Sequence, residues 1–188
     1  MLALQQEGGR KVSLLDGETI RQELSAELGY SRQDRETNIH RMAFVASELT
    51  KAGAATVCAA IAPYETARQR AREAIGKHGG FYLIYMATPL EHAVERDRQG
   101  VYERAHKGEI KGAPGRHAHG RCAGSLLICG LATDALWDVL AAGFTGVDDP
   151  YEPPAKYDAK FDLSTMTVSQ IVHEIILLLE RDGYIGSS

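Results

Sequence analysis

The sequence predicts one α/β domain in which a parallel β-sheet is flanked by helices. Three short apolar runs, at residues 12–15, 54–61 and 81–87, lack the polar alternation of a half-exposed strand, so each is expected to be buried on both faces. Helical patterns alternate with these runs, and such alternation is typical of a doubly wound parallel sheet. The 188 residues suffice for one domain with its own core, and no internal repeat is present.

Composition excludes several classes of protein. A formal net charge of −4 creates no broad positive field for nucleic acid or a membrane surface, and 7% aromatic residues argue against a base-stacking platform. No segment approaches the ~18 consecutive apolar residues of a membrane span, and the N-terminus has no apolar signal core. Three cysteines, an odd number, form no disulfide framework. We therefore expect a cytoplasmic protein without nucleic-acid or membrane partners.

The first half of the chain supplies three expected helices. The run at 12–15 leads through Asp16 into a helix expected over 19–28, which Gly29 ends. A second helix is expected from about residue 34 to residue 51, because its apolar residues fall on one face at helical spacing: Ile39, Met42, Ala43, Ala46 and Leu49. After the strand at 54–61, the polar segment 64–76 is expected to be a third helix.

Two capping boxes mark the second half. The string "TPLE" places Thr88 as N-cap with Pro89 at the first helical position, which predicts a short helix to about residue 98. The string "TVSQ" at 167–170 opens the last helix, whose buried face is expected to comprise Ile171, Val172, Ile175, Ile176 and Leu179. Between them lies the segment 112–143, which is rich in Gly and His at its start and apolar further on. Its composition differs from that of the segments on both sides.

A cluster of charged residues follows the first expected strand. Asp16, Glu18 and Arg21 lie where that strand passes into a helix, and ligand sites of open α/β sheets lie at the carboxyl ends of the strands. The two acids could hold Mg²⁺ or orient a hydroxyl group, and Arg21 could face an anion. Alternatively, the three are a turn residue, an acid at a helix start and a solvated arginine.

Two further groups of residues suit a phosphorylated ligand. Arg35 and Asn38 share one helical face, and these side chains can bind a phosphate and a sugar or base edge. The polar segments "YERAHKGEIK" (102–111) and "FTGVDDPYEPP" (144–154) could close over phosphates. Alternatively, the first pair belongs to a solvated helix face and the two segments are surface loops.

The sequence contains no G-x-x-x-x-G-K-[ST] phosphate loop. The nearest string, 115–122, has Arg121 and Cys122 in place of the Lys and the Ser/Thr, and no expected strand precedes it. The same region contains four potential zinc ligands, but their spacing fits no standard zinc site, and incidental residues are the favoured explanation: His117, His119, Cys122 and Cys129.

Taken together, these strings resemble the adenylylsulfate (APS) kinase family, most closely the kinase module fused to, or working beside, bacterial ATP sulfurylases. The resemblance covers roughly 11–112 and 144–186. The string "LLDGETIRQELSAELGYSRQDRETNIHR" corresponds to the signature after the family's second strand, "CAAIAPY" to the end of its third strand, and the two polar segments to its lid. Several motifs in the right order are more specific than any one of them.

The resemblance implies a P-loop-kinase-like fold and a reaction. The γ-phosphate of ATP passes to the 3′-hydroxyl of APS, giving PAPS and ADP, with Mg²⁺. By position, Asp16 and Glu18 match catalytic acids, with Glu18 at the metal, and Tyr30 and Phe144 match two aromatics that enclose the adenine. The full set of implied substrate contacts is Arg21, Tyr30, Arg35, Asn38, Ile61, Ala62, Lys111, Phe144, Thr145 and Gly146. An ATP sulfurylase and a second copy of the chain are the implied protein partners.

The sequence also departs from the family. It begins inside the family's first helix, around residues 2–6, so the first strand and phosphate loop are missing; we expect the sheet to lose a central strand and to expose its edges. Residues 113–143 are expected to interrupt the lid as an insert within a single domain, 1–188. Glu18 stands where an Asp is usual, and Ala62 stands where a Ser is frequent.

Two functions therefore remain open at this stage. One is an APS kinase-type phosphotransferase of sulfate activation. The other is a non-catalytic regulatory module that binds APS or PAPS, similar to the kinase-like domain of some fungal ATP sulfurylases, or else an inactive remnant of such a domain.

Overall fold

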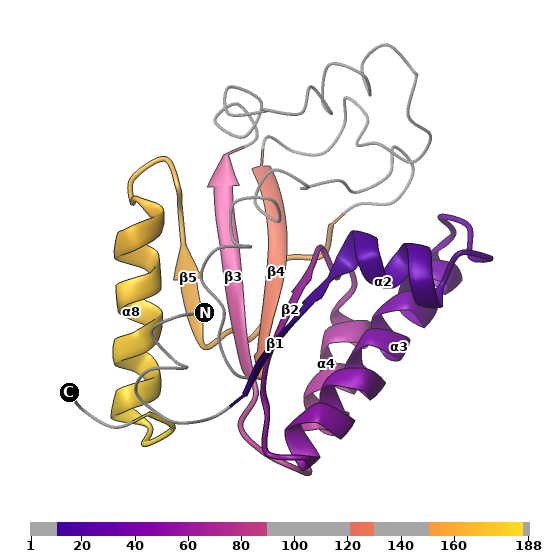
Figure 1. The fold of residues 1–188 in the computed structure, drawn as a ribbon. Helices are drawn as coiled ribbons and strands as arrows, with labels where there is room; N and C mark the ends of the chain where they lie inside the picture. Colours follow the sequence, from indigo (N-terminus) through magenta and orange to yellow (C-terminus); the bar gives the residue numbers. More distant parts are fainter. Residues whose placement is uncertain (1–10, 90–120, 130–150, 186–188) are drawn as a thin grey trace.

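The computed structural model describes residues 11–89, 121–129 and 151–185, which form a five-stranded sheet and four helices (Figure 1). The strands are β1 (Val12–Asp16), β2 (Ala55–Ala60), β3 (Tyr82–Pro89), β4 (Arg121–Cys129) and β5 (Ala159–Phe161), in the spatial order β1-β2-β4-β3-β5. The pairs β1–β2 and β3–β5 are parallel. All six residues of β2 are buried, as its unbroken apolar run predicts.

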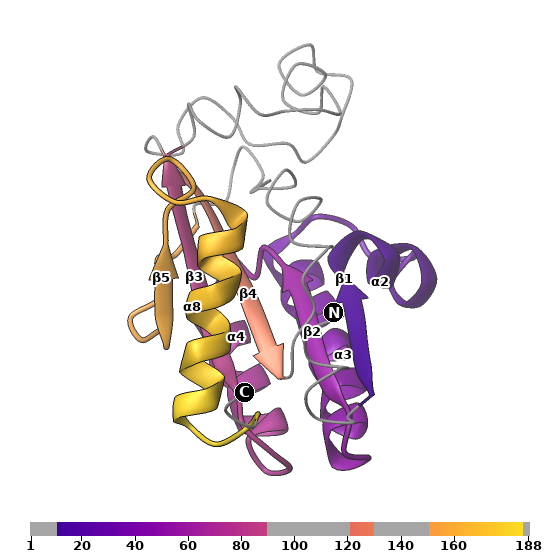
Figure 2. The same cartoon turned by 60° about the vertical axis from the view of Figure 1, so that its left-hand side comes forward.

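The centre of the sheet differs from the expectation. We expected a missing central strand and exposed edges, and this was wrong, because β4 lies between β2 and β3. β4 is antiparallel to both neighbours, so its direction is opposite to theirs (Figure 2). Its backbone hydrogen bonds satisfy polar groups that β2 and β3 would otherwise leave unpaired. The apolar character of residues 121–129 was evident in the sequence, but a short apolar run does not distinguish a strand from a buried helix.

Helices cover both faces of the sheet and enclose two cores. α2 (Gly17–Leu24), α3 (Arg32–Lys51) and α4 (Glu65–Ile75) lie on one face, and α8 (Val168–Arg181) lies on the other (Figure 1). Alternate residues of β2 point to the two sides: Cys58 belongs to the core under α3 and α4, and Val57 to the core under α8.

None of the described helices is long and apolar enough to cross a membrane.

Two element boundaries differ from the sequence-based expectations. α2 ends at Leu24 and does not continue to residue 28; the carbonyl of Leu24 accepts a hydrogen bond of 2.6 Å from Arg41 Nη1, which satisfies one of the terminal carbonyls. Thr88 does not cap a helix, because Thr88 and Pro89 are the last two residues of β3. The Thr88 Oγ1 atom instead accepts a hydrogen bond of 3.0 Å from the backbone N–H of Leu163. The helix expected up to residue 98 lies outside the described residues.

The capping box of α8 is confirmed. The N-cap Thr167 accepts a hydrogen bond from the Gln170 backbone N–H, and the Gln170 side chain accepts one of 2.8 Å from the Thr167 backbone N–H. Of the predicted face, Ile171, Ile175 and Leu179 are buried against the sheet, whereas Val172 and Ile176 are only partly buried. The two reciprocal hydrogen bonds fix the start of the only described helix on this face.

Replacing Thr167 with Ala should lower the free energy of unfolding by about 1 kcal/mol, because the helix start loses its side-chain acceptor. Urea denaturation followed by circular dichroism measures the change. Ser169→Ala is the matched control, since Ser169 is exposed on the first turn of the same helix. Equal midpoints for Thr167→Ala and the wild type would show that the cap does not stabilise the domain.

Candidate functional site

The register of β1 and β2 places the segments that follow these two strands at the same edge of the sheet. Asp16, the last residue of β1, is paired with Ala59, so the start of α2 and the turn at Ile61 and Ala62 leave the sheet from neighbouring strands. Gly17 makes this approach possible, because a Cβ atom there would lie 2.8 Å from the backbone oxygen of Ala59. The carboxyl ends of parallel strands thus define the candidate site, as expected.

Asp16 has a structural contact at this edge. Its Oδ1 atom accepts hydrogen bonds from the backbone N–H groups of Glu18 (3.0 Å) and Thr19 (2.9 Å), which makes it the N-cap of α2. The Glu18 carboxylate is exposed and accepts a hydrogen bond of 3.2 Å from Gln22. Each carboxylate has further lone pairs, so both can still accept from a ligand or coordinate an ion.

The two acids fit only one mode of Mg²⁺ binding. In the described part of the chain, no group of three His, Cys, Asp or Glu side chains converges on a point, so these residues provide no cage made of protein alone. Mg²⁺ commonly binds one or two carboxylates and completes its shell with water and substrate phosphates. Asp16 and Glu18 suit this second mode.

Arg21, Tyr30 and Arg35 form a compact cationic cluster beside the edge. The guanidinium carbons of Arg21 and Arg35 lie 4.2 Å and 5.5 Å from the centre of the Tyr30 ring. Arg35 Nε donates to the Tyr30 carbonyl at 3.0 Å, and Arg21 donates to the carbonyls of Leu28 and Gly29. Among the described residues, neither guanidinium is paired with a carboxylate, so two positive charges face no counterion there. Such a cluster suits an anionic ligand.

Asn38 presents a buried acceptor one helical turn beyond Arg35. Its side chain is only 8% exposed, and its Oδ1 atom has no hydrogen-bond partner among the described residues. Leaving a buried polar atom without a partner costs about 1–3 kcal/mol. A ligand that donates a hydrogen bond to Asn38 would recover that cost, and the position of Asn38 on α3 is therefore consistent with a binding role.

The turn after β2 is strained. Ala62 has φ +41°, in the left-handed region that is unfavourable for a residue with a Cβ atom, and it is almost completely buried. Its carbonyl accepts a hydrogen bond of 2.7 Å from Arg68 Nη1. Strained backbone is concentrated at ligand sites, but its presence here was not visible in the sequence, where the turn was assigned only by resemblance.

The sequence analysis did not identify Arg68 and Glu152, which support this turn. The Arg68 side chain is 1% exposed and donates to the Ala62 carbonyl, to the Glu65 carboxylate (2.6 Å) and to the Glu152 carbonyl (2.7 Å). A signal for Arg68 was available, since it occupies the same helical stripe as the buried Tyr64, Ala71 and Ile75. Glu152 offered no such signal, because its partners are distant in the sequence.

Ion pairs shift two pKa values around the turn. Burial alone would raise the pKa of Glu65, but hydrogen bonds from Arg68 and Gln69 outweigh it, and the pKa lies below its usual value. Burial alone would lower the pKa of Arg32, yet Glu152 and Glu36 hold it above its usual value. Both groups therefore stay ionised near neutral pH, and the ion pairs persist.

Several predicted site residues lie outside the described residues. These are Lys111, Phe144, Thr145 and Gly146, as well as His117 and His119 of the zinc hypothesis. The described members of the predicted set lie at the end of β1, in α2, α3 and the connection between them, or in the turn after β2: Asp16, Glu18, Arg21, Tyr30, Arg35, Asn38, Ile61 and Ala62.

The described residues form a three-layer α/β domain with a cationic cluster at one edge of its sheet. A family model described as adenylylsulphate kinase matches residues 2–119, and the chain belongs to that family. Among solved structures, the Mycobacterium tuberculosis APS kinase in complex with AMPPNP and APS superposes with a TM-score of 0.70 at 29% identity, covering 94% of this chain and 84% of that one. The hexameric APS kinase of Thiobacillus denitrificans gives a TM-score of 0.61 at 28% identity, covering 100% of this chain and 26% of that one.

Curated relatives include much longer proteins. The sulfate adenylyltransferase of Coccidioides immitis is 51% identical over 184 residues, which are 98% of this chain and 27% of that protein. The sulfate adenylyltransferase of Aspergillus oryzae is 50% identical over 183 residues, 97% of this chain and 26% of that protein. The chain thus spans about a quarter of the length of the curated relatives it matches.

Replacing Arg68 with Met should lower the free energy of unfolding by about 3–5 kcal/mol, because the substitution leaves buried partners of a hydrogen-bonded charge pair unsatisfied. Thermal and urea denaturation measure the effect. Arg70→Met is the control on the same helix, since the Arg70 side chain is 66% exposed and reaches Glu36 only at 3.8 Å. Similar losses in both variants would contradict the buried role of Arg68.

The same variant has a predictable pH dependence. Because the pKa of Glu65 is lowered in the folded protein, its stabilising contribution is present above its ordinary value of 4.5 and is lost as the pH falls through the lowered value. The stability gap between the wild type and Arg68→Met should therefore narrow below pH 4.5 in urea titrations. A gap that widens on acidification would show that the Glu65 charge opposes the fold.

Proposed function

We propose that this chain is an APS kinase-type domain of sulfate activation and that it binds an adenylyl sulfate nucleotide at the carboxyl edge of β1 and β2. The observation that supports this most strongly is the cluster of Arg21, Tyr30 and Arg35 without carboxylate partners in the described part of the chain, beside the buried acceptor of Asn38. Two cations, an aromatic face and an amide match the phosphosulfate, base and ribose of such a ligand.

The roles of individual residues follow from this placement. Arg21 and Arg35 would hold the phosphosulfate, Asn38 the ribose, and Tyr30 one face of the adenine. The backbone at Ile61 and Ala62 would line the same pocket, and Lys111 and the stretch from Phe144 through Thr145 to Gly146 would close over it. The similarity to a structure that contains both APS and an ATP analogue supports this arrangement.

The family reaction transfers the γ-phosphate of ATP to APS, producing PAPS and ADP. Mg²⁺, held by Glu18 with Asp16 beside it, would neutralise charge on the transferred phosphoryl group. The protein's own part is to orient the nucleotide and to stabilise negative charge, with Glu18 placed to assist the attacking hydroxyl.

A second candidate function is nucleotide binding without transfer, and the direction of β4 favours it. A phosphate loop follows the carboxyl end of a strand and leads into a helix. β4 presents its amino end at this edge, where Arg121 is paired with Pro89, the last residue of β3. In the described part of the chain, no central strand leads into a phosphate loop. For comparison, removing one fixed donor to a developing oxyanion slows an acyl-transfer enzyme by about 10²–10³.

The relatives of the chain support two proposals about its protein partners. Because the curated relatives are much longer sulfate adenylyltransferases, we propose that this domain works with an ATP sulfurylase, in the same chain or beside it. One relative with this fold is described as hexameric, which supports self-association, with a homodimer as the simplest form.

Two measurements test the proposal. Isothermal titration with APS and with PAPS should give a saturable one-site isotherm for at least one of them, and failure to bind either would overturn it. Incubation with Mg-ATP and APS then separates the two candidates. Formation of PAPS at an ordinary kinase rate selects the phosphotransferase, and binding without PAPS formation selects the regulatory module.

Arg35→Ala and Asn38→Ala should each weaken APS binding about tenfold or more, because each removes a direct contact to a charged or polar ligand group. The melting temperature should change little, since Asn38 Oδ1 has no partner to lose among the described residues. Calorimetry and thermal denaturation report the two effects. Gln33→Ala is the control on the exposed side of α3. A large fall in melting temperature with unchanged affinity would assign both residues to the fold.

A further inference from the structure

We propose that Glu152 is a positioning residue of the nucleotide site. It fixes the strained turn at Ala62 relative to α3, the helix that carries Arg35 and Asn38. The inference rests on the proposed function, because it takes the edge beside Ala62 as the place where the nucleotide binds. It concerns a residue that contacts the supporting elements and not the ligand itself.

The carboxylate of Glu152 joins the starts of two helices. Its Oε2 atom accepts a hydrogen bond of 2.8 Å from the backbone N–H of Glu65, the first residue of α4. The side chain of Tyr64, the N-cap of α4, does not cap the helix, and a residue 87 positions away from Glu65 supplies the acceptor. The Oε1 atom accepts a hydrogen bond of 3.1 Å from Arg32, the first residue of α3.

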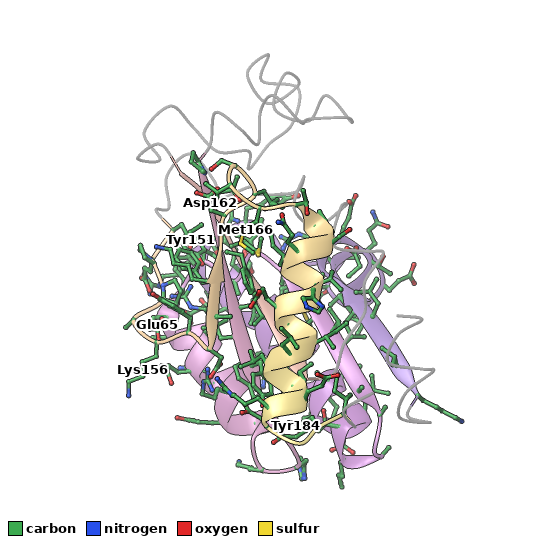
Figure 3. The ribbon with its side chains drawn as sticks, turned by 90° about the vertical axis from the view of Figure 1, so that its left-hand side faces the viewer. Glu65, Tyr151, Lys156, Asp162, Met166 and Tyr184 are labelled. Carbon is green, nitrogen blue, oxygen red and sulfur yellow. The ribbon has the colours of Figure 1, made fainter. Side chains whose placement is uncertain are left out.

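The backbone of Glu152 holds the turn from the other side. Its N–H donates to the Pro63 carbonyl at 2.8 Å, and its carbonyl accepts from Arg68 Nη2 at 2.7 Å. The same guanidinium donates to the Ala62 carbonyl. Tyr151 and Glu65 lie on the same flank of the molecule (Figure 3), and Arg68 lies 5.5 Å from the centre of the Tyr151 ring. Thus the Ala62 carbonyl, through Arg68, and the Pro63 carbonyl, directly, are both bound to the segment that contains Glu152.

The ion pair that Glu152 forms with Arg32 acts mainly on the geometry of the site. The ion pair of Arg32 and Glu152 is solvent-exposed, and exposed pairs contribute little to stability. Arg32 also lies over the Tyr64 ring, 4.2 Å from its centre, so its direction depends on both Glu152 and Tyr64. The contacts of Glu152 therefore hold the start of α3 and the turn at Ala62 in a fixed relative position.

The test compares Glu152→Ala and Glu152→Gln with the wild type by calorimetric titration of APS, with a melting temperature for each protein. We expect Glu152→Ala to weaken APS binding about tenfold to a hundredfold, the scale of a small displacement of site groups. The melting temperature should fall by only about 2–4 °C, the scale of losing one helix-capping acceptor in a domain of this size. Glu152→Gln should retain part of the affinity, because its amide oxygen can still accept one of the two hydrogen bonds. Glu48→Ala is the control, since Glu48 forms an exposed ion pair with Lys51 at the far end of α3.

The outcomes separate the inference from the proposed function. If the wild type does not bind APS, the proposed function fails and this inference fails with it. If the wild type binds APS and Glu152→Ala binds equally well, the inference is wrong while the proposed function stands. If both Glu152 variants melt near the assay temperature, Glu152 is a stability residue and the inference is also wrong.

Discussion

The parallel pairing of β1 with β2 is the constraint on which the rest of the site depends. This pairing places Asp16 opposite Ala59, and therefore places the start of α2 next to the turn at Ala62. A shift of one residue along the strand would turn Cys58 and Val57 to the wrong cores. The buried side chains thus fix the register, and the register fixes which polar groups meet at the edge.

A second set of contacts, those of Arg68, fixes the conformation of the turn at this edge. The buried Arg68 guanidinium binds the Ala62 carbonyl, the Glu65 carboxylate and the Glu152 carbonyl, so the segment after β2 and the distant segment around Glu152 meet at one planar group. A buried arginine is tolerable only when its donors are used, and this requirement explains why the two segments converge. The strain at Ala62 persists because the surrounding contacts hold it.

Sequence reasoning predicted the parts of the fold that depend on local patterns. The unbroken apolar runs of β2 and β3, the helical spacing of Ile39, Met42 and Ala43, and the capping box at Thr167 are each confirmed. It failed where a tertiary contact decides the outcome: Thr88 binds Leu163 and does not cap a helix. Glu152 was missed for the same reason, because its partners are distant in the sequence, whereas Arg68 was missed although it lies on the buried stripe of its helix. The family resemblance located the described site residues on neighbouring elements, and their contacts with a ligand remain a prediction.

The central strand is the part of the sheet that bears on mechanism but not on family membership. The chain has the adenylylsulphate kinase fold, yet β4 fills the middle of the sheet in the antiparallel direction. The cationic cluster around Tyr30 does not depend on β4, since it is built from α2, α3 and the loop between them. The proposed nucleotide binding therefore does not require the proposed phosphoryl transfer.

A crystal structure of the protein with APS bound tests the central claim most directly. Our account predicts the nucleotide at the carboxyl edge of β1 and β2, with its phosphosulfate on Arg21 and Arg35 and a donor on the ligand within hydrogen-bond distance of Asn38 Oδ1. A nucleotide bound at any other part of the surface, with the Arg21, Tyr30 and Arg35 cluster unoccupied, would contradict it.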